Sequence, residues 1–319
     1  MTASTPSPWA AALPAAPHLL ERPAALLRFS GPDALRVLHG QTSQALQDAR
    51  PGDWRSTCCL SATARLRGLA EVLVDEDGAW LALTAGDGPA LRVAFDRVLF
   101  PADQVELGAL RSGRWLRSIA QEPAAVPGRW RPLEGGGGWW LGSDALLLDD
   151  APPPEPLASL PPLTGAQAEL WRIGRGEPAW PAEINDAFNP FELGLADRVS
   201  LSKGCYVGQE TLAKLASGDG VKQRLRRWHA QTGETSVAPF EAGLTLLDGG
   251  GDRAGQITSC LHLADGRWVG LAMVRRMALD HTTLWAELTH TRLPLHLSRP
   301  SAFVDPPPPS GGGRRSGLA

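Results

Sequence analysis

The sequence predicts an α+β fold made of several units, with a β-barrel near its carboxyl end. Three observations indicate this class. Strand-like and helix-like segments mix without the strict alternation of a doubly wound sheet. A proline-rich stretch near residue 151 separates two parts of the chain. From about Val221 onward, short apolar stretches alternate with turns, as is typical of a small barrel or sandwich.

The first half of the chain predicts a strand, a helix, a hairpin and a second helix, in that order. A short apolar strand ends at a turn around Gly31, and the helix that follows carries apolar residues at helical spacing. The dipeptide Asp77-Gly78 lies between two apolar runs, which predicts a β-hairpin. An amphipathic helix then ends before Pro101, and a strand follows at 105–107.

The middle of the chain contains the strongest loop signals. Glycines at 135–138 indicate a flexible hairpin connection, and a helix begins at Thr164. The segment 177–204 is rich in loop residues and leads into the motif LSKGCYVGQET. Long loops without secondary structure in a compact protein are usually functional. We therefore expect the site to involve this segment.

These signals divide the chain into six parts. They are a flexible tail (1–17), an N-terminal α+β unit (18–150), a proline-rich linker (151–162), a second α+β unit with the motif (163–228), the β-barrel (229–302) and a C-terminal flexible tail (303–319).

Composition narrows the class of protein. A net charge of −3 over 319 residues argues against direct nucleic-acid binding, because such proteins usually carry a basic surface. No apolar run approaches the length of a membrane span, so we expect no membrane association. The four cysteines form no disulfide framework and no signal peptide is evident, which favours a reducing, cytoplasmic location. The scattered histidines predict no metal site.

The motif at 201–211 places a thiol in a shaped loop. Two glycines flank a Cys-Tyr pair, which indicates a bend or a close approach of the backbone. Cys205 follows Lys203 closely and precedes a helix expected to start near Gly208, and both features can lower the pKa of a thiol. Cys205 is therefore a nucleophile or a soft ligand, or alternatively a buried small hydrophobe.

Two further features leave alternatives open. In VKQRLRRWHA, the cations Lys222, Arg224 and Arg226 share one strand face, which could bind phosphate or polycarboxylate or could simply be solvated. The other cysteines lie in apolar, strand-like stretches, and we expect them in the core. They are Cys58, Cys59 and Cys260.

With these residues in view, the sequence resembles the YgfZ-type folate-binding proteins, GcvT-like relatives of the glycine-cleavage T protein, an aminomethyltransferase. The hallmark of that family is K-G-C-[FY]-x-G-Q-E, and residues 203–210 fill every fixed position. The lead-in P-x-E-x-G-L is matched at 190–195. The segments FSGPDALRVLHGQTS, AGQITSC and VGLAMVRR extend the resemblance over 26–297.

The resemblance implies a T-protein-like fold of α+β units around a central channel, with a C-terminal β-barrel. It implies that tetrahydrofolate binds in the channel. It also implies a role in the assembly or repair of iron–sulfur clusters, with iron–sulfur proteins or assembly factors as partners and indirect effects on tRNA modification. The alternative is a tetrahydrofolate-dependent aminomethyl transferase, so the question of enzymatic turnover stays open.

The resemblance also assigns roles to residues. Cys205 is the functional thiol, and Lys203 tunes or positions it. Arg172, Glu192 and Arg224 are expected folate contacts, because a carboxylate can meet the pterin amino groups and an arginine the glutamate tail. The other residues assigned to cofactor binding belong to the motif. They are Gly204, Tyr206, Gly208, Gln209 and Glu210.

Three positions separate this chain from the T protein. The T protein uses an Asp in the strand corresponding to RLRGLAEVLV, where this chain has Glu71. It carries a Glu after an Arg-Ile pair, where this chain has Gly174. Both differences weaken the case for aminomethyl transfer. The T protein has an aromatic residue at the position of Cys205, so the cysteine indicates the YgfZ branch.

Overall fold

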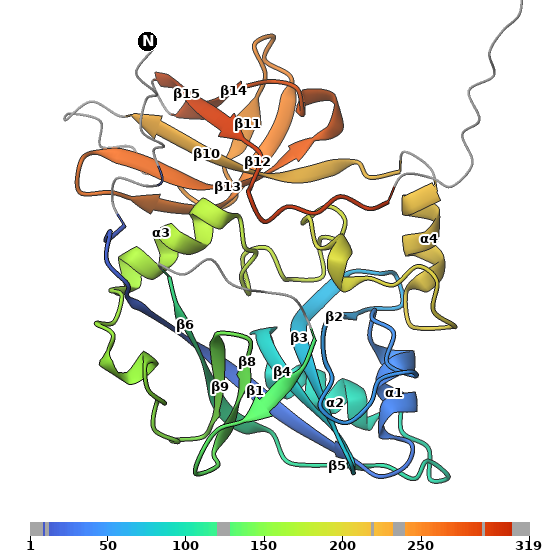
Figure 1. Cartoon of the computed structure of the whole chain (residues 1–319). Helices are drawn as coiled ribbons and strands as arrows, with labels where there is room; N and C mark the ends of the chain where they lie inside the picture. Colours follow the sequence, from blue (N-terminus) through green and yellow to red (C-terminus); the bar gives the residue numbers. More distant parts are fainter. Residues whose placement is uncertain are drawn as a thin grey trace, which may run out of the picture.

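Two β-structures make up the body of the protein: an open sheet and a closed barrel. The computed structural model describes Trp9 and residues 13–119, 128–217, 220–231, 240–288 and 291–307. Figure 1 shows the barrel above the sheet, with helix α3 (Gly165–Arg175) between them. The α+β class and the barrel near the carboxyl end are confirmed.

The sheet has nine strands, and its neighbouring pairs are antiparallel. The strand order is β2-β3-β4-β1-β6-β9-β8-β7, and β5 pairs with β1. The strands are β1 (Leu19–Ser30), β2 (Trp54–Leu60), β3 (Leu66–Asp75), β4 (Gly78–Gly86), β5 (Glu106–Leu107), β6 (Arg111–Ser118), β7 (Trp130–Pro132), β8 (Gly138–Leu141) and β9 (Asp144–Leu148). The hairpin expected at Asp77-Gly78 is the β3–β4 connection, so this prediction is confirmed.

The two faces of the sheet have different neighbours, because side chains alternate along a strand. One face is apolar and packs against α1 (Ala34–Gln41) and α2 (Gly88–Asp96). Phe29 of β1 and Phe95 of α2 meet there edge to face, with ring centroids 5.3 Å apart. The opposite face carries polar and charged side chains and is covered by loops from the second half of the chain.

The barrel closes through six strands in the order β10-β13-β12-β11-β14-β15, with β15 pairing back to β10. Its interior is filled by apolar side chains such as Trp228 and Phe240, whose rings lie 5.1 Å apart. The strands are β10 (Gln223–Gln231), β11 (Thr245–Leu247), β12 (Arg253–His262), β13 (Arg267–Arg275), β14 (Thr283–Leu288) and β15 (Thr291–Ser298). Among the described residues, the interior of the barrel is therefore a filled apolar core.

Two helices connect the sheet to the barrel. Helix α3 and α4 (Gln209–Ser217) share one apolar cluster with residues of β3 and β13. Leu170 and Ile173 come from α3, and Leu212 comes from α4. Because one core spans all of these elements, the sheet and the barrel are fixed relative to each other at this junction.

The ends of the expected units differ from the sequence-based boundaries. Strand β10 begins at Gln223, so the barrel begins before the boundary at residue 229 and cuts into the expected second α+β unit. In the expected C-terminal tail, Phe303 is buried and Val304 donates its N–H to Gly194. In the expected N-terminal tail, Trp9 is buried. Residues 1–8, 10–12 and 308–319 of these tails lie outside the described residues.

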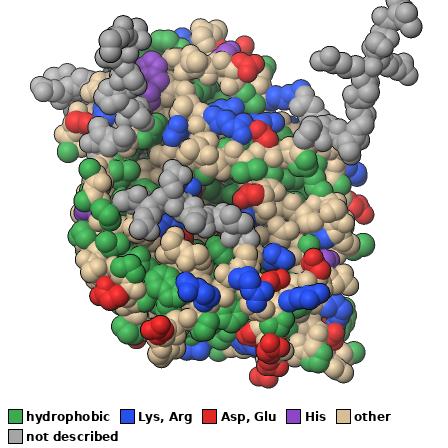
Figure 2. Space-filling view, viewed as in Figure 1, with side chains coloured by type: hydrophobic (Ala, Val, Ile, Leu, Met, Phe, Trp, Pro, Cys, Tyr) green, Lys and Arg blue, Asp and Glu red, His purple; other side chains and the backbone are tan. Residues whose placement is uncertain are grey.

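The surface carries both signs of charge. On the face drawn in Figure 2, Lys and Arg side chains are interspersed with Asp, Glu and apolar side chains. This mixture agrees with the net charge of −3. Within the described ranges, no helix combines the length and apolarity needed to cross a membrane.

Candidate functional site

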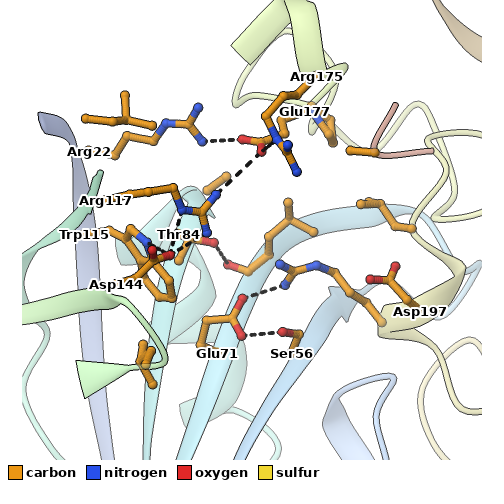
Figure 3. Close-up of a pocket in the computed structure, with 18 of the residues that line it drawn as sticks. Arg22, Ser56, Glu71, Thr84, Trp115, Arg117, Asp144, Arg175, Glu177 and Asp197 are labelled. Carbon is orange, nitrogen blue, oxygen red and sulfur yellow. Dashed lines mark hydrogen bonds and ion pairs between the residues drawn. The ribbon is translucent and has the colours of Figure 1, made fainter. Parts of the chain in front are cut away.

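A cavity of about 330 Å³ lies between the polar face of the sheet and the loops that follow α3. This volume is within the range of small-molecule sites. Antiparallel register brings distant residues to one wall: Arg22 lies opposite Trp115, and Ser56 lies opposite Glu71. In Figure 3, Arg22 and Arg117 reach toward Glu177 in the loop after α3, while Ser56 and Glu71 lie together on the sheet wall.

Asp144, the first residue of β9, has two carboxylate oxygens in very different environments. Its Oδ2 accepts hydrogen bonds from Trp115 Nε1 at 2.9 Å and from Arg117 Nε at 2.8 Å. Arg117 Nη2 donates to the same oxygen at 2.5 Å. Its Oδ1 is buried and accepts no hydrogen bond from any described residue. A buried ionised oxygen without a donor is costly, so this atom is suited to a ligand that brings one.

Three arginines surround Glu177 at another part of the wall. Arg22 and Arg175 donate to its carboxylate at 2.7 and 2.9 Å, and Arg117 lies 3.9 Å away. All three guanidinium groups also lie 5.1–5.7 Å from the ring of Trp171. Burial would raise the pKa of Glu177, but Arg22 and Arg117 outweigh burial and lower it. The glutamate is therefore ionised at neutral pH, and positive charge is in excess around it.

One nitrogen of this arginine group has no partner. The Nη2 atom of Arg22 is buried and makes no hydrogen bond within the described ranges, whereas its Nη1 donates to Glu177. The cavity wall thus holds one unpaired donor and, at Asp144, one unpaired acceptor. Buried polar groups are nearly always hydrogen-bonded, so each atom calls for a polar partner, which an ordered water or a polar ligand can supply.

Glu71 lies in the same wall, and both of its carboxylate oxygens contact donors of the protein. Its Oε2 accepts from Trp54 Nε1 at 2.7 Å and from Ser56 Oγ at 2.6 Å. Its Oε1 lies 2.9 Å from Arg198 Nη1. Burial alone would lower the pKa of Arg198. The nearby carboxylate of Glu71 raises this pKa, and the net change is upward. The side chain of Glu71 is therefore held in place by Trp54, Ser56 and Arg198.

Lys203 is buried and anchors the motif loop to the end of α1. Its ammonium donates to the backbone carbonyls of His39, Thr42 and Gln44, the last two at 2.6 and 2.9 Å. It also lies 4.4 Å from the ring centroid of Tyr206. Burial lowers the pKa of Lys203 to about 7 and raises the pKa of Tyr206 to about 12. The ammonium of Lys203 points at carbonyl groups, so this residue holds the motif loop against the end of α1, and its effect on the thiol stays a prediction.

Cys205 is exposed at the surface, just before α4. The helix begins at Gln209, as expected, and Gln209 Nε2 donates to the carbonyl of Lys203 at 3.2 Å, which closes the loop. Glu210 is exposed in the first turn of α4, where a negative charge favours the helix N-terminus. The prediction that Cys205 is a small core hydrophobe is therefore wrong.

The two motif glycines lie in different surroundings. Gly208 has φ +84°, and a Cβ on it would lie 3.0 Å from Ala64 Cα and from Ser61 O. Glycine alone tolerates both conditions. A Cβ on Gly204 would meet no atom within 4 Å, so the expected close approach is absent there.

One segment connects the motif loop to the cavity wall. Arg198 lies in the wall and its carbonyl accepts from Ser43 Oγ at 2.6 Å. The N–H of Ser200 then donates to the carbonyl of Ser43 at 2.9 Å. Lys203 and Cys205 follow directly. The cavity wall and the motif loop are therefore joined by a short stretch of chain that is hydrogen-bonded to Ser43.

The residues predicted to contact folate lie elsewhere. The ten predicted site residues, all described, are absent from the wall of the 330 Å³ cavity. Arg172 is buried and donates to Glu169, Glu183 and Ser259 Oγ, the last at 2.8 Å in β12. It therefore ties α3 to the barrel, and its role as a folate contact stays a prediction.

Glu192 and Arg224 are also outside the cavity. Glu192 is buried beside an open groove that Arg65 and Lys222 also line, and burial raises its pKa. Arg224 forms an ion pair with Asp305 in the C-terminal segment. The lead-in and the basic strand thus serve the junction with the barrel.

The sequence did not indicate the cavity residues, because their pattern along the chain is that of ordinary strand residues. Arg22, Trp115, Arg117 and Asp144 stand at alternate or terminal positions of strands, where charged residues normally face solvent. Within the described ranges, no group of three or more His, Cys, Asp or Glu side chains could hold a metal ion. The lining of the cavity includes arginines, carboxylates and tryptophans.

Comparison with known proteins places the fold. No family model matches the chain. A chloroplastic protein of Arabidopsis thaliana, named provisionally as a transferase, is 38% identical over 118 residues, or 37% of this chain. The match spans 26% of that protein, about a quarter of its length.

A solved structure matches most of the chain. The glycine cleavage system aminomethyltransferase T of Bartonella henselae superimposes with a TM-score of 0.67, covering 91% of this chain and 87% of that one. Sequence identity is 17%, so the likeness concerns the fold. The expected T-protein-like fold is confirmed.

Proposed function

We propose that this chain is a folate-binding accessory protein for the assembly or repair of iron–sulfur clusters, with Cys205 as its functional thiol. The observation that carries the folate part is the cavity, in which Asp144 Oδ1 and Arg22 Nη2 are buried without partners. The observation that carries the thiol part is the exposure of Cys205 in the K-G-C-Y-V-G-Q-E motif.

The cavity suits a reduced folate in shape and chemistry. Trp54 and Trp115, whose rings lie 6.5 Å apart, supply apolar surface for a flat ring. Asp144 and Arg22 offer an acceptor and a donor for the polar edge of a pterin. Arginines also match carboxylates well, and Arg175 is one that could meet the glutamate tail. Tetrahydrofolate, when bound, would supply its one-carbon chemistry there.

The thiol assignment is supported by contrast with the other cysteines. Burial raises the pKa of Cys58 to about 12 and that of Cys59 even further. Burial also raises the pKa of the half-buried Cys260. The thiolate is the reactive form, so burial lowers the reactivity of these three thiols. Cys205 is the exposed thiol available to a partner.

The accessory role defines the partners. Iron–sulfur proteins or their assembly factors would meet the exposed Cys205, and tRNA-modifying enzymes that contain clusters would be affected indirectly. Such thiol chemistry needs a reducing compartment such as the cytoplasm.

The alternative is a tetrahydrofolate-dependent aminomethyl transferase, which the fold neighbour and the name of the plant relative favour. Glu71 weighs against it. Its two oxygens already take three protein donors, so it is poorly placed to act as a base. A turnover assay with an aminomethyl donor and tetrahydrofolate separates the two roles.

The test combines binding with a cellular readout. Calorimetry should detect tetrahydrofolate binding to the wild type and equally to Cys205→Ser. In cells that lack the protein, Cys205→Ser should fail to restore the activity of a cluster-dependent enzyme, whereas Cys260→Ser should restore it. No tetrahydrofolate binding would refute the folate part, and full rescue by Cys205→Ser would refute the thiol part.

A further inference from the structure

We propose that Asp144 recognises the pterin end of the bound folate by accepting an N–H hydrogen bond at Oδ1. This inference rests on the proposed folate binding and adds the residue that fixes the orientation of the ligand. It concerns a residue of β9 that the sequence motifs do not mark.

The two carboxylate oxygens of Asp144 differ in their hydrogen bonds. Asp144 is 3% exposed, and Trp115 and Arg117 place three donated hydrogen bonds on Oδ2. Oδ1 is buried and has none. The carboxylate cannot rotate to share these donors without breaking bonds to both side chains. Its free oxygen is therefore held in place for a donor from outside the protein.

The pterin end of a folate can supply that donor. The 2-amino-4-oxopyrimidine edge of a pterin presents N–H donors beside a carbonyl acceptor. The glutamate tail ends in carboxylates, which would be repelled by Asp144. Arg22 Nη2, the other buried atom without a partner, could donate a hydrogen bond to the carbonyl on the same edge of the pterin. Arg22 lies opposite Trp115 in the sheet, and Trp115 donates to Asp144.

The loop side of the cavity wall suits the glutamate tail of the ligand. Arg175 lies in the wall on the loop side and would attract the carboxylates of the tail. The sheet side, with Asp144, then receives the pterin.

The variant Asp144→Asn tests this directly. Its amide oxygen can keep the hydrogen bonds from Trp115 and Arg117, while its NH₂ group stands where Oδ1 was and opposes an N–H donor. The matched control is Asp149→Asn, because Asp149 pairs with Arg111 next to the same strands but lies outside the cavity wall.

Binding is measured for tetrahydrofolate and for two fragments, 6-methyltetrahydropterin and p-aminobenzoylglutamate. Asp144→Asn should bind tetrahydrofolate and the pterin fragment about 10- to 100-fold more weakly, as expected for one lost hydrogen bond to a charged group. Binding of p-aminobenzoylglutamate should stay within about twofold of the wild type, below the effect of one weak hydrogen bond. Asp149→Asn should bind all three like the wild type.

Several outcomes would overturn the proposal. Unchanged pterin binding by Asp144→Asn, or an equal loss for p-aminobenzoylglutamate, refutes it while leaving folate binding intact. Absence of tetrahydrofolate binding by the wild type refutes the proposed function as well. If Asp144→Asn does not fold, an NMR measurement on the wild type tests the same contact. With ¹⁵N-labelled ligand, the pyrimidine N–H protons should show an NOE to the Trp115 indole proton, and its absence refutes the assignment.

Discussion

Replacing Lys203 with methionine should lower the free energy of unfolding. Methionine keeps most of the buried aliphatic stem and removes the ammonium. The carbonyls of His39, Thr42 and Gln44 would then lose a charged donor at the end of α1. The same donor lies over the ring of Tyr206.

The magnitude follows from opposing effects. Hydrogen bonds to a charged group contribute about 1.5–3 kcal/mol each, and burial of the ammonium offsets part of the sum. We expect a net loss of about 2–3 kcal/mol from these terms. Urea unfolding followed by tryptophan fluorescence measures it, with Lys214→Met as the control, because Lys214 is exposed on α4. A loss below about 0.5 kcal/mol, the usual range for surface changes, would refute the anchoring role.

The pH dependence tests the burial effect separately. Burial lowers the pKa of Lys203 to about 7 in the folded protein, below its value in the unfolded chain. Between these two values the unfolded chain binds more protons, so wild-type stability rises with pH. Lys203→Met lacks this group, so the stability difference between the two proteins should widen from about pH 7 to pH 10, near the unperturbed lysine value. A difference that stays constant would mean that the three carbonyls keep the ammonium charged.

Two further changes test the loop and the lead-in. Gly208→Ala should lose about 1–3 kcal/mol of stability, because alanine is strained at φ +84° and its Cβ would crowd Ala64, whereas Gly204→Ala should stay near the wild type. Equal losses in thermal unfolding would contradict this reasoning. Burial raises the pKa of Glu192, so the folded protein holds that proton more tightly and wild-type stability falls as pH rises from the unfolded value through the folded one. Glu192→Gln lacks this effect, so its unfolding free energy should gain on that of the wild type as the pH rises above about 4.3, the unperturbed value. A difference independent of pH would count against the burial of that carboxylate.

Local signals predicted the elements well, because the forces that set them act over a few residues. Thr164 caps α3 and forms a reciprocal capping box with Gln167, which matches the helix start expected there. Adjacent Cys58 and Cys59 point into different cores, as strand alternation requires. The expected membership of Cys260 in the core is only partly met, since it is half-buried.

The cavity could not be predicted in the same way, because it depends on the pairing of distant strands. Nothing near Arg22 in the sequence indicates that Trp115 lies opposite it. Glu177 belongs to a loop, and its three arginine partners come from three separate elements. The motif around Cys205 was visible because it is contiguous. The residues of the motif loop are adjacent in the sequence, whereas those of the cavity wall are far apart in it.

The wall of the cavity has a consequence for the biogenesis of the protein. It draws on residues from Leu20 in the first strand to Ala302 after the last one. A nascent or truncated chain lacks part of this wall and gains nothing from the ligand, whereas a finished chain does. At a ligand concentration of 100 times Kd the gain is about 2.7 kcal/mol. Under the proposed folate binding, a supply of folate would stabilise completed molecules, and those without ligand would be more open to proteolysis.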